Sequence, residues 1–106
     1  MDIIAQWHSD SGHAWLKVWA SDCERLGLKE GDFSRFSYKR GRDSLVVYFL
    51  ECDSDAGFFI EAAKRHGVKI QYGPQYHWGD RANIRNLPRM AGESRLWNAA
   101  MNKGAA

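Results

Sequence analysis

Arginine and aromatic side chains occur together in two short segments of this 106-residue chain. Such side chains are the usual anchors of protein interfaces, and they also contact phosphates and stack on bases. The candidate partner-binding residues lie after Pro74 and are Tyr76, Trp78, Arg81, Arg85 and Arg89. The residues of a secondary, basic hairpin are Arg35, Tyr38, Lys39, Arg40 and Arg42. We expect both segments to bind a partner; the alternative is that they are solvated turns whose aromatic rings fold inward.

Cysteine and histidine offer a second kind of chemistry, through a reactive thiol or a metal ion. Cys52 stands just before a predicted helix, whose amides can lower a thiol pKa, and it can pair with His66. Cys23 can pair with His13 in the same way. The four His and two Cys fall into none of the common metal-binding spacings. We therefore predict no metal site, no cofactor and no catalytic residue, and a thiol enzyme is the least favoured alternative.

Three carboxylates, Glu51, Asp53 and Asp55, follow the most apolar segment of the chain. Acidic residues at the end of a strand are placed where α/β proteins often have their sites. Helix capping is the simpler interpretation, because Ser54 or Asp55 can accept hydrogen bonds from the first turn of a helix. The sequence contains no glycine-rich phosphate loop.

The predicted core that must hold these residues is the stretch from Leu45 to Gly67. The run from Leu45 to Leu50 is continuously apolar or aromatic, which is typical of a strand buried on both faces. A helix is predicted from Asp55 to His66, with Gly67 ending it in the left-handed conformation. This strand and helix form the scaffold of the fold.

Other elements follow from local patterns. Strands are predicted at 2–7, 13–20, 33–39 and 68–72, and Gly73 with Pro74 breaks the last of them. Ser21 and Glu24 form a capping box that starts a short helix, which Gly27 ends. A hairpin turn at 39–43 makes its two flanking strands antiparallel neighbours. A short turn of helix after Asp80 and a last helix at 93–103 complete the prediction.

The 13–20 strand alternates, and its second face carries His13, Trp15 and Trp19. Either another element of the chain covers this aromatic face or a second copy does, which makes a homodimer possible. The elements together predict a single α+β domain over residues 1–106. Its mixed or antiparallel sheet has four to five strands with the Asp55 helix on one face, and residues 104–106 form a frayed tail.

Composition argues against a small domain that depends on disulfides or metal, and against a membrane protein. Hydrophobic residues make up 44% of the chain, and five Trp, five Phe and four Tyr are enough for a core without disulfides or metal. Residues 1–60 have a net charge of −3 and residues 61–106 a net charge of +5, which favours a basic C-terminal surface. No signal peptide or membrane-spanning run is visible, so we expect a soluble protein in the cytoplasm of a bacterial host.

Four segments carry a resemblance to a known family: 13–18 (HAWLKV), 36–38 (FSY), 48–59 (YFLECDSDAGFF) and the pair Ile84–Arg85. They resemble the pattern HGWL-x-V, S-x-SY, YLEED-x-DA-x-x-F and a basic tail with IR, found in small proteins of phages, plasmids and other mobile elements. The resemblance covers about residues 12–88. Ala14 stands where Gly is usual, and Cys52 where an acid is usual. The family has no established activity.

The sequence and this resemblance together favour a non-enzymatic protein. We expect it to bind and inhibit a host nucleic-acid-processing or defence complex, as anti-CRISPR proteins do, through Tyr76, Trp78, Arg81, Arg85 and Arg89. The partner is then a host protein or ribonucleoprotein. Direct nucleic-acid binding is the alternative. The sequence also predicts that replacing Arg81 and Arg85 by Glu abolishes binding without changing the thermal midpoint.

Overall fold

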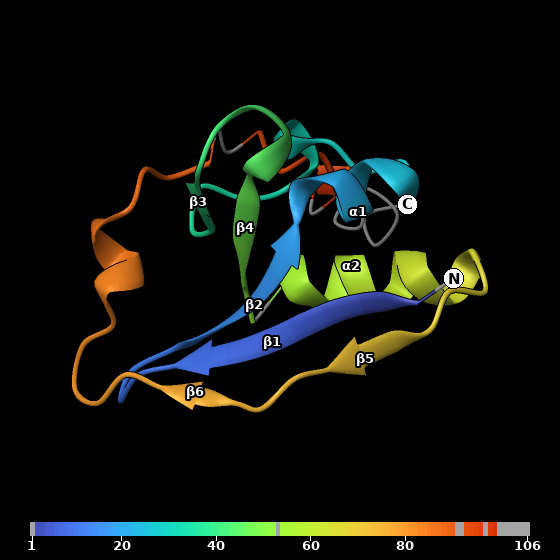
Figure 1. Cartoon of the computed structure of the whole chain (residues 1–106). Coiled ribbons are helices and arrows are strands. Elements are labelled where there is room, and N and C mark those ends of the chain that lie inside the picture. Colours follow the sequence, from blue (N-terminus) through green and yellow to red (C-terminus); the bar gives the residue numbers. More distant parts are fainter. Residues whose placement is uncertain (1, 53, 91–92, 97, 100–106) are drawn as a thin grey trace.

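The computed structural model describes residues 2–52, 54–90, 93–96 and 98–99. A mixed sheet in the order β3-β4-β2-β1-β5 forms its centre, and β6 also pairs with β1 (Figure 1). The strands are β1 (Ile3–Ser9), β2 (Ala14–Trp19), β3 (Tyr38–Arg40), β4 (Val47–Glu51), β5 (Ile70–Tyr72) and β6 (Tyr76–His77). The helices are α1 (Ala20–Arg25) and α2 (Asp55–Arg65), with 3-10 turns η1 (Glu30–Asp32), η2 (Asp43–Leu45) and η3 (Asn83–Asn86). The predicted α+β class is confirmed.

β1 is paired on both sides. β2 runs antiparallel to it, while β5 and β6 run parallel to its first and second halves. The predicted break at Gly73 and Pro74 therefore divides one edge strand into two short ones, which is why the sheet has more strands than expected. β4 and β5, which α2 connects, point the same way, but β2 and β1 lie between them.

β4 is buried on both faces, as its apolar run predicts. One face packs against α2 and α1, whose side chains join those of β1 and β2 in the main core (Figure 1). The core residues that α2 contributes are Ala56, Phe59, Ala62 and Ala63, and the strands contribute Ile3, Ala5, Leu16, Val18 and Leu50. Removing this apolar surface from water is the main stabilising contribution to the fold.

The second face of the sheet is covered by the chain itself. Ala82 and Ile84, from the segment after Pro74, pack against Trp15, Phe49 and neighbouring side chains. Trp15 is only 1% exposed, whereas Trp19 at the end of β2 remains 42% exposed. Of the two interpretations of this aromatic face, the structure therefore supports cover by another element of the same chain.

The capping of both helices differs from the prediction, although α2 starts at Asp55 as predicted. α1 begins at Ala20 with Trp19 in the N-cap position, so the capping box at Ser21 and Glu24 is wrong. The reason is that β2 passes directly into the helix, one residue before the predicted cap. Ser54 is the N-cap residue of α2, but its side chain makes no capping bond and donates to Glu51 instead. Both predicted helix ends are confirmed by left-handed Gly27 and Gly67, with φ of 76° and 66°.

The hairpin before β4 is longer than predicted. β3 contains only Tyr38–Arg40, and Phe33 enters the core from a turn rather than from a strand. Leu45 lies in η2 and is 69% exposed, so the buried run starts at Val47. The antiparallel pairing of β3 and β4 is nevertheless confirmed.

Beyond Met90 the structure describes only residues 93–96 and 98–99. Residues 95–96 and 98–99 are helical, and the Asn98 amide donates to the Ser94 carbonyl at 2.9 Å. The rest of the predicted last helix and the frayed tail at 104–106 lie outside the described residues. Within the described part of the chain, none of the helices has the length and apolar character needed to cross a membrane.

Gly41 should tolerate no side chain. Its φ is 93°, and a Cβ there would lie closer than 3.0 Å to the carbonyl oxygen of Leu45. We expect Gly41→Ala to lower the free energy of unfolding by about 2–3 kcal/mol in urea denaturation, from backbone strain and this clash. Gly27→Ala is the matched control, because Gly27 has a similar positive φ but nothing within 4 Å of the new Cβ. Equal losses for both variants would contradict the role of the clash.

Candidate functional site

A cavity of about 570 Å³ opens where the ends of β2 and β4 meet the segment after Pro74. Its walls combine aromatic rings, charged groups and hydroxyls from parts of the chain far apart in sequence. The lining residues are His13, Trp15, Ser34, Phe36, Tyr38, Glu51, Ser54, Arg85, Arg89 and Ser94. A concave, partly apolar site of this size with a few converging polar groups is the usual form of a binding site.

The two predicted partner-binding segments meet at this cavity. Arg89, from the segment after Pro74, forms a backbone bridge with Tyr38 of the basic hairpin. The Arg89 guanidinium lies over the Tyr38 ring at 5.5 Å, and its Nη1 donates to the Arg35 carbonyl at 3.4 Å. The segment after Pro74 and the basic hairpin are therefore neighbours in the fold.

Arg85 lines the cavity, but its guanidinium is bound by Asp10. Arg85 Nε donates to Asp10 Oδ2 at 2.7 Å and Nη2 donates to Oδ1 at 3.0 Å. The Arg85 guanidinium also lies 5.2 Å from the centre of the Trp15 ring. The hydrogen bond from Arg85 holds the pKa of Asp10 well below its usual range, while the bond to Asp10 raises the pKa of Arg85. Arg85 thus fastens η3 to the sheet.

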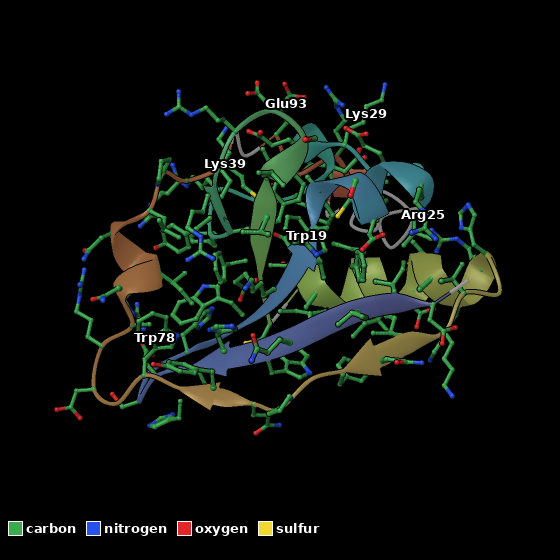
Figure 2. All side chains as sticks on the ribbon, viewed as in Figure 1. Trp19, Arg25, Lys29, Lys39, Trp78 and Glu93 are labelled. Atoms are coloured by element: carbon green, nitrogen blue, oxygen red, sulfur yellow. The ribbon has the colours of Figure 1, made fainter. Side chains whose placement is uncertain are left out.

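Tyr76 and Trp78 hold the chain against β1, outside the cavity lining. Trp78 Nε1 donates to His8 Nδ1 at 3.0 Å, and the Tyr76 ring lies 5.4 Å from that of His8. Burial, with smaller effects from Lys17 and Arg40, lowers the pKa of His8 to about 4. The neutral ring therefore accepts at Nδ1 and donates at Nε2 to Gln6. Figure 2 shows Trp78 at this end of β1, and Tyr76 remains 49% exposed.

The other predicted basic residues lie outside the cavity lining. Lys39, labelled in Figure 2, forms an ion pair with Glu30 at 3.0 Å. The Arg40 guanidinium lies over the Phe49 ring at 5.4 Å. Arg81 and Arg42 are exposed on the surface. Arg35 is exposed and lies beside two lining residues, Phe36 and the exposed Arg89, and we call these three residues the rim of the cavity.

Asp55, one of the three predicted carboxylates, is the acceptor in a buried hydrogen-bond network beside the cavity. Asp55 Oδ2 accepts from the Ser34 amide, the Ser34 hydroxyl and the Ser37 hydroxyl. The Ser37 hydroxyl in turn accepts from the Glu51 amide at 2.9 Å. Asp55 therefore ties the start of α2 to the 34–37 turn that forms one wall of the cavity. Asp53, the third predicted carboxylate, lies outside the described residues.

His13, Glu51 and Cys52 come together where β2 starts and β4 ends. His13 Nε2 lies 3.2 Å from Glu51 Oε1, and the ligand atoms of all three residues lie within 4.8 Å of one another. Cys52 thus has His13 as its neighbour, whereas the predicted partner His66 bonds to the Ala62 carbonyl on α2. Cys23 is fully buried, and burial raises the pKa of its thiol, so the structure does not support it as a nucleophile.

Sequence reasoning missed this cluster because spacing along the chain does not reveal it. Ala14 O accepts from the Cys52 amide, so the antiparallel register joins residues that are far apart in sequence. Pairing the predicted strands at 13–20 and 45–50 would have placed His13 beside Glu51 and Cys52.

Motif residues of the mobile-element resemblance also gather at the cavity. His13, Trp15, Tyr38, Glu51 and Arg85 line it, and the Ser37–Asp55 bond lies beneath it. In comparisons with known proteins, no family model matches the chain, and no curated protein or solved structure is significantly similar to it. A functional proposal therefore depends on the geometry of the cavity and its rim.

Proposed function

We propose that the chain is a non-enzymatic binding protein of phage or mobile-element origin that inhibits a host nucleic-acid-processing or defence complex. One observation carries this proposal: both basic, aromatic segments converge on a single cavity, joined by Arg89 and Tyr38. A rim that combines exposed arginine and aromatic side chains around a concavity has the composition of a protein-interface hot spot. The mobile-element origin is taken from the sequence resemblance.

The rim specifies the chemistry of the partner. Phe36 is 55% exposed, and the Arg35 guanidinium lies 5.7 Å from the centre of its ring. Arg35 and Arg89 form no ion pair with a carboxylate in the described part of the chain, in contrast to Arg85. Guanidinium groups bind carboxylates and phosphates in a bidentate geometry. The partner surface therefore presents an apolar side chain next to acidic groups.

Reversing two charges at the rim should abolish partner binding. We expect the variant Arg35→Glu with Arg89→Glu to bind at least about 100-fold more weakly, because each hot-spot side chain contributes about 2 kcal/mol or more. Both side chains are exposed, so the thermal midpoint should stay near that of the wild type. The measurement is retention of a host complex on immobilised protein, followed by assay of the complex's nuclease activity.

A matched control variant distinguishes an effect of the rim from a general effect of reduced positive charge. Arg42→Glu with Arg81→Glu makes the same change of charge at exposed positions outside the rim formed by Arg35, Phe36 and Arg89. Retention of the complex by the control but not by the rim variant supports the proposal. Equal retention by the wild type and the rim variant would refute it. Arg85 is unsuitable for this test, since its replacement also breaks the ion pair with Asp10.

Direct nucleic-acid binding is the second candidate, because the exposed Phe36 ring beside Arg35 suits base stacking next to a phosphate contact. This function predicts an affinity for single-stranded nucleic acid that falls steeply with salt. A gel-shift series that shows no retardation at low salt would exclude it. Retardation abolished by the Arg35→Glu, Arg89→Glu variant would favour it over a protein partner.

A further inference from the structure

We infer that His13, Glu51 and Cys52 form a zinc-binding site at one side of the cavity. Imidazole nitrogen, carboxylate oxygen and thiolate sulfur are the three donor types that zinc takes from proteins. The three residues come from the start of β2 and the end of β4, so the sheet register holds them together.

The separation of the first two donors already matches a zinc site. Zinc binds His nitrogen at about 2.0–2.1 Å and carboxylate oxygen at about 2.0–2.2 Å, so tetrahedral geometry sets these two atoms roughly 3.3 Å apart. His13 Nε2 and Glu51 Oε1 are 3.2 Å apart. The Cys52 sulfur lies within 4.8 Å of a ring nitrogen of His13 and of a carboxylate oxygen of Glu51, and a rotation that moves it by about 1 Å completes three-ligand coordination.

Neighbouring groups fix two of the proposed ligands in place. The Ser54 hydroxyl donates to Glu51 Oε2 at 3.0 Å, which leaves Oε1 directed at His13. The Glu51 amide donates to Ser37 Oγ, and the His13 ring packs edge-on against Trp15 at 5.1 Å. Hydrogen bonds of this kind orient the ligands of metal sites and raise their affinity.

The adjoining cavity gives the site an open position. His13 and Glu51 both line the cavity, and the Glu51 side chain is only 7% exposed while that of His13 is 26% exposed. Three protein ligands next to an accessible space leave the fourth position of zinc for a water molecule or another donor. A thiolate ligand favours zinc over magnesium or calcium, which prefer oxygen donors only.

Zinc titration of the reduced full-length chain, stripped with a chelator, tests the inference. We expect one zinc ion per chain and a rise in thermal midpoint with zinc. Cys52→Ser should lower the zinc affinity at least about 100-fold, since even changes to residues behind the ligands cost 10–100-fold. This variant keeps the backbone bond from Cys52 to Ala14 and a side chain of similar size, so it should fold.

Cobalt provides a spectroscopic readout of the sulfur ligand. The wild-type chain loaded with Co²⁺ should show a thiolate-to-cobalt charge-transfer band, which Cys52→Ser and His13→Gln should lose or weaken. His77→Gln is the matched control, because His77 is exposed and lies on β6, which β1 separates from β2 and β4. Absence of saturable zinc binding in the wild type, or unchanged affinity in Cys52→Ser, would overturn the inference.

The zinc site is independent of the proposed partner surface. The Arg35→Glu, Arg89→Glu variant leaves all three donors intact, and we expect it to bind zinc as the wild type does. Loss of zinc binding in that variant would mean that the metal is held by the wider cavity rather than by this cluster, which would contradict the assignment.

Discussion

Replacing Asp10 by alanine should lower the free energy of unfolding by about 3–5 kcal/mol, because it leaves a charged partner and several amides without an acceptor. The Asp10 carboxylate is fully buried and binds Arg85 through both of its oxygens. It also accepts from the amides of Gly12, His13 and Ala82 at 2.9 Å each. This one side chain therefore joins the β1–β2 turn to the segment that covers the second face of the sheet.

Urea denaturation of matched variants measures this effect. Glu24→Ala removes an exposed acid from α1 and should change stability by no more than about 0.5 kcal/mol. The double variant Asp10→Ala with Arg85→Met should be more stable than the sum of the two single losses predicts, because it leaves no unpaired charge. A loss below about 1 kcal/mol for Asp10→Ala would contradict the role of this carboxylate.

The same carboxylate makes stability depend on pH. The Arg85 hydrogen bond, followed by bonds from the Ala82 and Gly12 amides, lowers the pKa of Asp10 in the folded state. Unfolded Asp has a pKa of about 3.9, so the stabilisation is fully present above that pH. It is lost as the pH falls below about 4 toward the folded-state pKa. Asp10→Asn should show a shallower decline of unfolding free energy over this acidic range.

The scaffold was predictable because its signals are local. An apolar run without alternation specifies a doubly buried β4, and the periodicity of α2 with left-handed Gly67 specifies the following helix. The turn before β3 was not predictable in the same way. Ser34 and Ser37 stand in a sequence with a strand-like pattern, but they bond to Asp55 about 20 residues later and leave the strand conformation. Only the folded structure brings such partners together.

The cavity shows the same division between local and long-range information. The residue types of the rim were visible in the sequence, and the structure places Arg89 and Tyr38 side by side. The sequence did not show that Arg85 has a structural role, because its acceptor is Asp10, near the other end of the chain. The prediction that Arg81→Glu with Arg85→Glu leaves stability unchanged therefore conflicts with the ion pair between Arg85 and the buried Asp10 carboxylate.

Replacing Asp55 by alanine should cost about 3–4 kcal/mol of unfolding free energy, since it leaves three buried donors without their acceptor. Its Oδ2 accepts from the Ser34 amide and from the hydroxyls of Ser34 and Ser37, and Asp55 is 1% exposed. Asp55 is also the first residue of α2, where the helix dipole favours a negative charge. The substitution should therefore loosen both the 34–37 turn and the start of the helix.

Two further variants show whether the acceptor or its charge matters more. Asp55→Asn keeps a carbonyl oxygen that can occupy the Oδ2 position, so we expect about half the loss seen for Asp55→Ala. Ser37→Ala in combination with Asp55→Ala should cost less than the sum of the two single losses, because their shared bond is lost only once, while the Glu51 amide still loses its acceptor. Because Ser34 and Phe36 line the cavity, partner binding by Asp55→Ala should weaken even below its thermal midpoint. Stability within 1 kcal/mol of the wild type for both Asp55 variants would show that the network does not hold the cavity wall.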